Sequence, residues 1–369
     1  MLQLPDLGAN LLDDIRVAVP DRNGHNAGER IEVAGAALVN DVLLVVVVVI
    51  ALGFDFTNGF HDTANAIATS VGTRAVTPRV AVLVAAVANL AGAFVTTAVA
   101  KSVATGIIDG NLATQQTLVA ALIGAIVWNL LTWWLGLPSS SSHALIGGLI
   151  GAALVQSGEQ GVLWHSVAHK VVIPALLAPG IAFAAAFLVL LAVYWLFSRL
   201  NPGIAGRGFR LGQLGTGTWV AFTHGANDAQ KTMGVIALAL VLHRHGDVSS
   251  LDIPTWVKVA AGLAIGLGTY VGGWRIIRTL GQGVFRMEPE SGFAAQAAGG
   301  TTIYLATKYG YPLSTTHVVS GAVMGAGATK RLSAVRWGVA GNIVVAWVLT
   351  IPAAALVAAA LYWPVQGLF

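Results

Sequence analysis

Two short polar stretches inside apolar segments constrain the fold of this chain most strongly. Residues 57–65 read TNGFHDTAN, and residues 223–231 read THGANDAQK. Aligned from their first threonines, the two stretches pair Gly59 with Gly225 and Asp62 with Asp228. A charged side chain at the centre of a bilayer costs several kcal/mol unless it has a partner. We therefore expect the two stretches to lie together inside a bundle of membrane helices.

The surrounding composition defines the class of protein. Hydrophobic residues make up 56% of the 369 residues and charged residues only 10%, which is more apolar surface than one aqueous core could hide. The sequence therefore predicts an all-α polytopic membrane protein. The absence of cysteine excludes disulfides and thiolate metal sites. The net charge of +4 is modest and spread along loops, so we expect no nucleic-acid partner.

Apolar segments fall into two sets of five, and with broken elements they make about 10 to 12 membrane segments. Since five is odd, the two sets must face opposite ways, which predicts two inverted-topology repeats of the kind found in secondary transporters. The segments are expected near 37–71, 79–100, 115–136, 143–156, 171–197, 211–242, 256–274, 291–308, 317–328 and 337–362.

One segment of each repeat is interrupted. Pro138 precedes four serines and then a helix too short to cross a bilayer alone, and Pro312 precedes LSTTH and a second short helix. The two superpose when Pro138 is aligned with Pro312. We interpret each as half of a broken or re-entrant element. Both short helices carry GxxxG at the same register, at Gly147, Gly151, Gly321 and Gly325.

The basic residues predict the orientation. With the N-terminus outside, the expected outer loops contain only Lys101, Lys170, Arg244 and Lys308. The expected inner loops contain Arg74, Arg79, Arg199, Arg207, Arg210, Arg275, Arg278, Arg286, Lys330, Arg331 and Arg336. This asymmetry favours a multi-pass protein of the cell membrane with both termini extracellular.

The chain then divides into four parts. A polar N-terminal tail covers 1–36 and lacks the basic start and apolar core of a signal peptide, so we expect a surface helix or a disordered tail. The first inverted repeat covers 37–197, a basic cytoplasmic linker 198–210, and the second inverted repeat 211–369.

Hydroxyl clusters begin both short helices. They could simply cap free backbone N–H groups. Two related helix N-termini facing each other would also make a donor-rich site with positive dipole ends, which suits a tetrahedral oxyanion. The candidate anion contacts are Ser140, Ser141, Ser142, Ser314, Thr315, Thr316 and the ammonium of Lys231.

The paired acids point to a coupling cation. Asp62 and Asp228 could cap broken helices or pair with Lys231. Beside an anion site they would repel the anion unless a cation or proton neutralised them, which is the logic of symport. Asn65 and Asn227 would complete the coupling-ion site, together with exposed carbonyls.

Four histidines occupy related positions and are candidates for a proton relay: His61, His224, His143 and His317. Neutral histidines bonded to the backbone are the alternative, above all for His143 and His317. No HExxH motif or zinc-site spacing is present, so we expect no resident metal and no cofactor.

The stretches GFHDTANA and GANDAQK, each followed in its half by P-x-S-S/T-S/T-H, resemble the two signatures of the inorganic phosphate transporter (PiT) family, whose usual motif is GANDVANA. The resemblance covers the chain from about residue 37, and the short linker resembles the prokaryotic low-affinity permeases. It implies uptake of phosphate or metal-phosphate coupled to protons or sodium, and commonly a homodimer. By motif position it implies the same coupling-ion and anion roles for the residues named above.

Two departures from the family favour protons as the coupling ion. His61 stands where the family usually has Asn. Sodium-coupled members are similar to this chain near Asn89 and Gln296 but carry a Glu at each of these two sites. With amides in place of these acids, this chain lacks oxygen ligands and negative charge that a sodium ion would need. A divalent metal could still travel with the phosphate.

Other functions remain open at this point. A channel would need a continuous polar stripe rather than two reflected clusters, and an embedded hydrolase would need an asymmetric centre, so the sequence indicates a transporter and no enzyme. A sulfate permease on the same scaffold is the main competitor. Unlike sulfate, monohydrogen phosphate can donate a hydrogen bond, so a carboxylate at the anion would favour phosphate.

Overall fold

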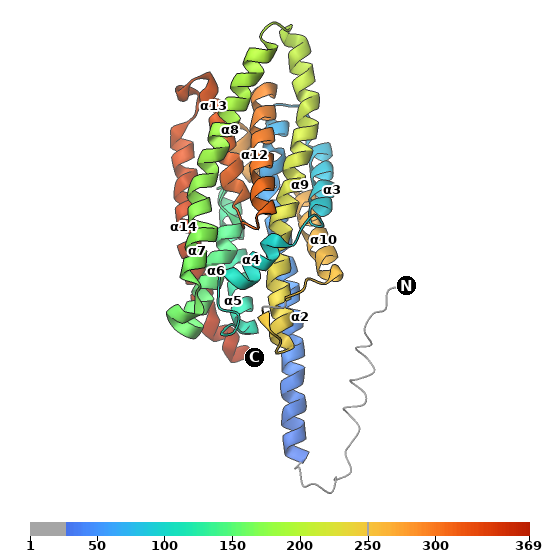
Figure 1. The fold of residues 1–369 in the computed structure, drawn as a ribbon, viewed down its shortest axis with the longest axis vertical. Helices are drawn as coiled ribbons and strands as arrows, with labels where there is room; N and C mark the ends of the chain where they lie inside the picture. The colour runs from blue at the N-terminus through green and yellow to red at the C-terminus, as the bar shows by residue number, and fades with distance from the viewer. Residues whose placement is uncertain (1–26, 249–250) are drawn as a thin grey trace, which may run out of the picture.

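The computed structural model describes residues 27–248 and 251–369, which form one bundle of helices (Figure 1). The two longest are α2 (Ala27–Gly72) and α9 (Pro202–His243). Each contains one of the polar stretches in its interior, without a break. Asp62 and Asp228 are therefore not helix caps, and that alternative was wrong. Of the tail predicted over 1–36, residues 1–26 lie outside the described part and residues from Ala27 on are helical.

The two halves of the chain follow a similar order of long and short helices. After α2 come α3 (Pro78–Gly92), α4 (Ala98–Gly106), α5 (Gln115–Leu135), α6 (Ser141–Ser157), the short η1 (Gly158–Gly161), α7 (Trp164–Val167), η2 (Ala168–Val172) and α8 (Ile173–Phe197). After α9 come α10 (Thr255–Val271), α11 (Trp274–Arg278), η4 (Thr279–Gly283), α12 (Pro289–Lys308), α13 (Thr315–Lys330), η5 (Leu332–Ala334) and α14 (Trp337–Leu368).

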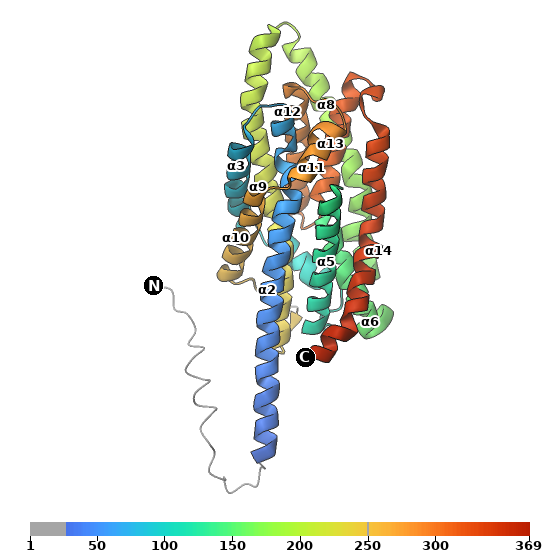
Figure 2. The ribbon, with the colours of Figure 1, turned by 180° about the vertical axis from the view of Figure 1, so that it is seen from behind.

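The short helices are exchanged between the halves. α6 packs on α14, and α13 packs on α8. The predicted GxxxG faces make these contacts, because a Cβ at Gly151 would overlap the carbonyl oxygen of Ala355, and one at Gly325 would overlap that of Phe183. Figure 2 shows α5 between α2 and α14, so the first half is also in contact with the end of the second.

Both predicted breaks are present and have the same geometry. α5 ends at Leu135 and is followed by Gly136 with φ of 70°, and the turn after α12 contains Gly310 with φ of 74°. Only glycine adopts this left-handed conformation readily. The alignment that pairs the two short helices also pairs these glycines, and a proline follows each by two positions, at Pro138 and Pro312. The chain therefore leaves each helix by the same turn before it enters the short helix.

Apolar side chains cover the outside of the bundle, as expected for a surface in contact with lipid. Trp195, Leu176 and Leu356 are each more than 70% exposed. Within the described residues, four helical stretches are long and apolar enough to cross a bilayer by themselves: Leu38–Gly72, Gln115–Leu135, Trp164–Phe197 and Trp337–Leu368. The remaining helices are shorter or more polar. The prediction of an all-α multi-pass protein with interrupted helices is confirmed.

Two expected segments differ from the structure. The predicted continuous segment at 79–100 was wrong, because α3 ends at Gly92 and a separate helix, α4, begins at Ala98. Gln230 of α9 explains this start, since its Oε1 accepts hydrogen bonds from the backbone N–H groups of Val99 (2.9 Å) and Ala100 (3.3 Å). The predicted linker 198–210 is not one loop either: only 198–201 connect α8 to α9.

The turn between α8 and α9 lies at one end of the bundle, and Phe369 lies toward the other end, near the first half of α2 (Figure 1). Both described chain ends therefore lie on the same side of the polar stretches, as an even number of crossings requires.

Candidate functional site

The N-termini of α6 and α13 meet in the middle of the bundle. Ser142 Oγ donates to the carbonyl oxygen of Leu313 (3.1 Å), and the rings of His143 and His317 are 4.6 Å apart between centroids. The first N–H groups of each helix have no partner within the helix and point toward this meeting place. Two positive dipole ends therefore converge on one buried region.

Two of the predicted anion contacts are helix caps. Ser140 Oγ accepts a hydrogen bond from the backbone N–H of His143 (3.1 Å), and Ser314 Oγ accepts one from that of His317 (3.2 Å). Each hydroxyl still has a proton to donate. The other four hydroxyls, at Ser141, Ser142, Thr315 and Thr316, make no such cap and face the polar stretches of α2 and α9.

Asp62 is buried and held by groups from three helices. His61 Nδ1 lies 2.6 Å from Asp62 Oδ1, and Thr316 Oγ1 of α13 donates to the same oxygen (3.3 Å). Ser141 Oγ of α6 lies 2.7 Å from Asp62 Oδ2 and also 2.7 Å from Asn58 Oδ1, so its single proton can go to either acceptor. The acid is therefore in direct contact with both hydroxyl clusters.

Asp228 pairs with the one lysine at this depth among the described residues. Lys231 Nζ lies 2.5 Å from Asp228 Oδ1 and donates to Ser142 Oγ (2.5 Å) and to the carbonyl oxygen of Leu313 (2.9 Å). Thr315 Oγ1 lies 3.5 Å from Asp228 Oδ2. Asp228 and Lys231 are 0% and 1% exposed in their side chains, so the ion pair has no solvent to screen it.

Two buried amide oxygens have no hydrogen-bond partner. Asn65 Nδ2 donates to Thr316 Oγ1 (3.0 Å), and Asn227 Nδ2 donates to Thr307 Oγ1 (2.9 Å) and to the carbonyl oxygen of Tyr311 (3.1 Å). The Oδ1 atoms of Asn65 and Asn227 are both unpaired. An unpaired buried acceptor is costly, and a cation would satisfy it. The carbonyls that face the site belong to the break before α13 and not to the polar stretches, whose helices are continuous.

The acids and one histidine form a compact group. Ligand atoms of Asp62, His224 and Asp228 lie within 4.8 Å of one another. His224 Nε2 is 3.2 Å from Asp228 Oδ2, so each acid has a histidine beside it. His143 and His317 do not belong to this group: their rings contact each other, and the ring of His317 also stacks on Trp347 with centroids 4.0 Å apart.

This site is built from two stretches of related sequence, and comparison with known proteins also matches the chain twice. The model of a family described as the phosphate transporter family matches residues 58–207 and again residues 201–358. The chain belongs to the phosphate transporter family. The first match includes residues 58–65 of the first polar stretch and all of α6, and the second includes the second polar stretch and α13.

Individual relatives agree over most of the chain. A protein of Mycobacterium tuberculosis named as a probable low-affinity inorganic phosphate transporter is 52% identical over 87% of this chain and 77% of its own length. A Bacillus subtilis protein of the same name is 43% identical over 89% of this chain and 98% of its own. A solved structure titled as the sodium-dependent phosphate transporter is similar with a TM-score of 0.82 and 26% identity, over 89% of this chain and 100% of the other.

The two amides singled out in the sequence lie beside the polar stretches of the transporter and are fully bonded. His224 Nδ1 lies 2.8 Å from Asn89 Oδ1, and Asn89 Nδ2 donates to Thr269 Oγ1 (2.9 Å). Gln296 Oε1 accepts from Thr216 Oγ1 (2.9 Å), and its Nε2 donates to Ser70 Oγ (2.7 Å). Each amide oxygen already takes part in one hydrogen bond within the protein.

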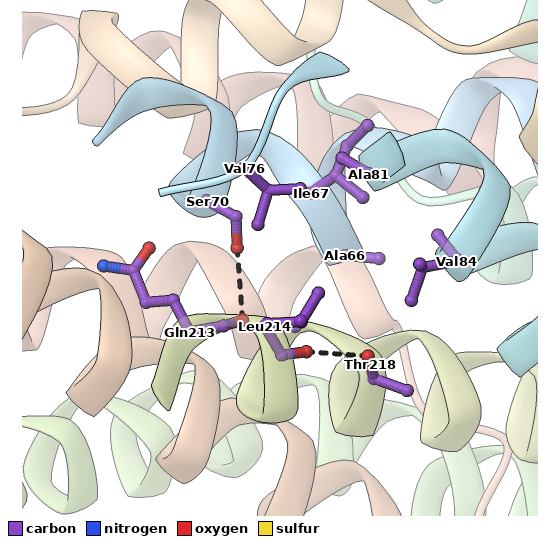
Figure 3. A pocket seen from close by; sticks show the side chains of 11 residues that line it. Ala66, Ile67, Ser70, Val76, Ala81, Val84, Gln213, Leu214 and Thr218 are labelled. Carbon is purple, nitrogen blue, oxygen red and sulfur yellow. Dashed lines mark hydrogen bonds between the residues drawn. The ribbon is translucent and has the colours of Figure 1, made fainter. Parts of the chain in front are cut away.

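A small cavity of the transporter lies next to the amide of Gln296. Figure 3 shows it between Ser70 of α2, Val84 of α3 and Thr218 of α9, where Ser70 Oγ is 3.5 Å from the carbonyl oxygen of Gln213. Its volume is about 20 Å³, enough for one water molecule. Gly217 lines the cavity, and a Cβ there would lie 3.1 Å from both Gln296 Nε2 and Ser70 Oγ.

Sequence reasoning gave no role to two polar residues of the transporter, Asn58 inside the first polar stretch and Asp55 just before it. Asn58 accepts a hydrogen bond from Ser141, and Asp55 is completely buried. The signal for Asp55 was available: an acid in an apolar run, seven residues before Asp62, lies two turns away on the same face of a helix.

Proposed function

We propose that this transporter imports inorganic phosphate by symport with a cation, and that the cation is a proton. The observation that carries the proposal is the contact between the two hydroxyl clusters and the two acids. Ser141 and Thr316 lie within hydrogen-bond distance of Asp62, and Thr315 lies 3.5 Å from Asp228. A positive charge bound at the acids would lower the free energy of binding an anion at the hydroxyls, and the bound anion would do the same for the positive charge.

Phosphate would bind at the uncapped hydroxyls, the helix N-termini and Lys231. Most of these hydroxyls are bonded to protein groups here, and Lys231 donates to Ser142 and Asp228. Phosphate binding would therefore exchange these internal bonds for charge-assisted bonds to its oxygens, which are about twice as strong as neutral ones. Because phosphate would compete with Asp228 for Lys231, anion binding would depend on whether the charge of Asp228 is neutralised.

The surroundings of the acids favour a proton. His61 and His224 each lie against one carboxylate, so each acid has a neighbour that can share a proton. Asn89 and Gln296 carry no charge and have both polar atoms bonded. The two amides therefore offer a sodium ion no negative charge, unlike glutamates at these positions.

Sodium is the second candidate, for a specific reason. The unpaired oxygens of Asn65 and Asn227 are suitable ligands for a hard cation, and the similar solved structure is named for sodium dependence. Sulfate is the second candidate for the anion, and phosphate is preferred because a hydrogen-bond donor on the anion can be accepted by Asp62 or Asp228. A divalent metal travelling with phosphate would require an acid to be released from its present partners.

We also propose that both chain ends lie outside the cell, that the turn at 198–201 lies inside, and that the protein works as a homodimer in the cell membrane. The basic residues Arg199, Arg207 and Arg210 gather at this turn, as the positive-inside rule requires for a cytoplasmic segment.

Uptake of radiolabelled phosphate into proteoliposomes tests the function. Imposed proton and sodium gradients are applied separately, with excess unlabelled sulfate as a competitor. We expect accumulation driven by the proton gradient and unaffected by sulfate. Accumulation that follows only the sodium gradient would assign the coupling ion to sodium, and strong inhibition by sulfate would change the substrate.

A further inference from the structure

A single buried acid, Asp55, lies beside the candidate site without belonging to the paired stretches. It is on α2, two turns before Asp62, and its exposed fraction is 0%. The alignment of the two polar stretches places Ala221 at the equivalent position of α9, so only one half of the transporter carries this acid. The twofold arrangement of the site therefore does not account for it.

Asp55 has only two neutral polar groups close to its carboxyl group, the Asn58 amide and the Thr232 hydroxyl, and neither makes a hydrogen bond of regular geometry to it. Both of its carboxyl oxygens are unpaired, and so are Nδ2 of Asn58 and Oγ1 of Thr232, which are its polar neighbours. All three side chains are buried. A buried carboxylate with no partner is among the most costly groups in a membrane protein, whereas the neutral acid is far less so.

The charges that act on Asp55 come from α9, which contributes Lys231 and Asp228. Lys231 is already paired with Asp228. Among the other helices that contact α2, α5 has no titratable residue, α10 has Lys258 in its first turn and Tyr270 in its last, and α6 has only His143. The lysines and arginines of α3, α11, α12 and α13 are exposed, and α13 also has the buried His317. No free cation in this set compensates a negative Asp55.

We propose that Asp55 binds the coupling proton and that the present structure is its protonated form. This inference rests on the proposed proton symport and names the residue that carries the proton. With the proton bound, Lys231 is held by Asp228 and directed at Ser142 and Leu313. When the proton leaves to water on the opposite side, the carboxylate of Asp55 competes with Asp228 for Lys231. The ammonium is then drawn away from the hydroxyls, and the hold on phosphate weakens.

The test uses the full-length protein in proteoliposomes with the variants Asp55→Asn, Asp55→Glu and Asp41→Asn. Asn resembles the protonated acid and cannot release a proton. We expect D55N to lose at least about tenfold in proton-driven phosphate accumulation, while exchange of internal labelled phosphate for external phosphate stays measurable, because exchange needs no net proton movement. D55E should accumulate phosphate. Asp41 is a matched control because it is an acid on the same helix whose side chain is 60% exposed.

Infrared spectroscopy of the purified protein gives a readout that does not depend on transport. The carbonyl band of a protonated carboxylic acid should be present in the wild type and should change its frequency in D55E. This comparison decides the matter even if D55N fails to insert.

Several results would overturn the role of Asp55: proton-driven accumulation by D55N equal to that of the wild type, an infrared band identical in the wild type and D55E, or wild-type accumulation driven by sodium without proton movement. The proposed function fails separately. Wild-type liposomes that accumulate no phosphate under either gradient reject it, and this inference with it.

Discussion

Asn65 and Lys231 stand at equivalent positions of the two repeats, and each donates a hydrogen bond to the short helix of the other repeat. Asn65 Nδ2 is 3.0 Å from Thr316 Oγ1, and Lys231 Nζ is 2.5 Å from Ser142 Oγ. Thr316 and Ser142 are themselves equivalent, since each lies four positions after the proline of its break. The contact is thus repeated within the molecule, while its charge differs between the halves. Only the second half brings a cation to the hydroxyls.

Replacing Lys231 by asparagine would make the two halves alike at this contact. We expect Lys231→Asn to raise the phosphate concentration for half-maximal uptake about tenfold or more, because a charged hydrogen bond worth about 1.5 to 3 kcal/mol is lost. Uptake kinetics in proteoliposomes measure this, with Lys101→Asn as the control, since Lys101 is exposed. An unchanged half-saturation would remove Lys231 from the anion site.

Neutralising Asp228 should separate stability from transport. Asp228→Asn is expected to insert but to lose coupled uptake, and to melt at a lower temperature because the ammonium of Lys231 stays buried without its partner, at a cost of about 3 to 5 kcal/mol. The double variant Asp228→Asn, Lys231→Asn removes both charges and should recover much of the melting temperature without recovering uptake. Normal accumulation by the single variant would contradict the role given to Asp228.

The uncapped hydroxyls should matter for affinity more than for assembly. Ser141→Ala and Thr315→Ala are each expected to weaken phosphate binding by about 1.5 to 3 kcal/mol, the range for a lost charged hydrogen bond. Half-saturation of uptake and the amount of protein in the membrane are measured together. Ser198→Ala serves as the control, because Ser198 is exposed at the turn between α8 and α9. If both variants keep the wild-type half-saturation, the hydroxyls do not bind the anion.

The exchanged helix contacts give a prediction about stability alone. Gly151→Ala and Gly325→Ala each place a methyl group against a backbone carbonyl, of Ala355 and Phe183 respectively, which cannot turn away. We expect each to destabilise the protein by about 1 to 3 kcal/mol, the usual cost of overpacking. Thermal unfolding in detergent measures this. Gly180→Ala is the control, since nothing lies within 4 Å of a Cβ there, and a similar loss in that variant would refute the packing argument.

Local sequence signals predicted most of the fold. Proline, glycine and serine clusters placed the interruptions at Pro138 and Pro312, and apolar runs placed the long helices, because both depend on residues that are neighbours in the chain. The break between α3 and α4 could not be predicted in this way. Its cap, Gln230, is more than a hundred residues away, so the signal exists only once α9 has packed beside α4.

Repetition within the sequence revealed the candidate site, and this also set its limit. Asp62 and Asp228 stood out because they occupy equivalent positions in the two aligned stretches, so a role for one suggests the same role for the other. Asp55 has no counterpart in the second half, and its lack of partners becomes visible only in the packed structure. Conversely, Ser140 and Ser314 shared the pattern of their neighbours, and only the geometry distinguishes these two caps from the uncapped hydroxyls.

The exchange of short helices between the halves bears on how such a chain could have arisen. Because α6 packs on α14 and α13 on α8, a half-length protein would leave a glycine face and an interrupted helix uncovered. A half-length ancestor would have needed a second copy inserted upside down in the same membrane. Fusion of two such copies through the short turn 198–201 would then have given every chain one half in each orientation.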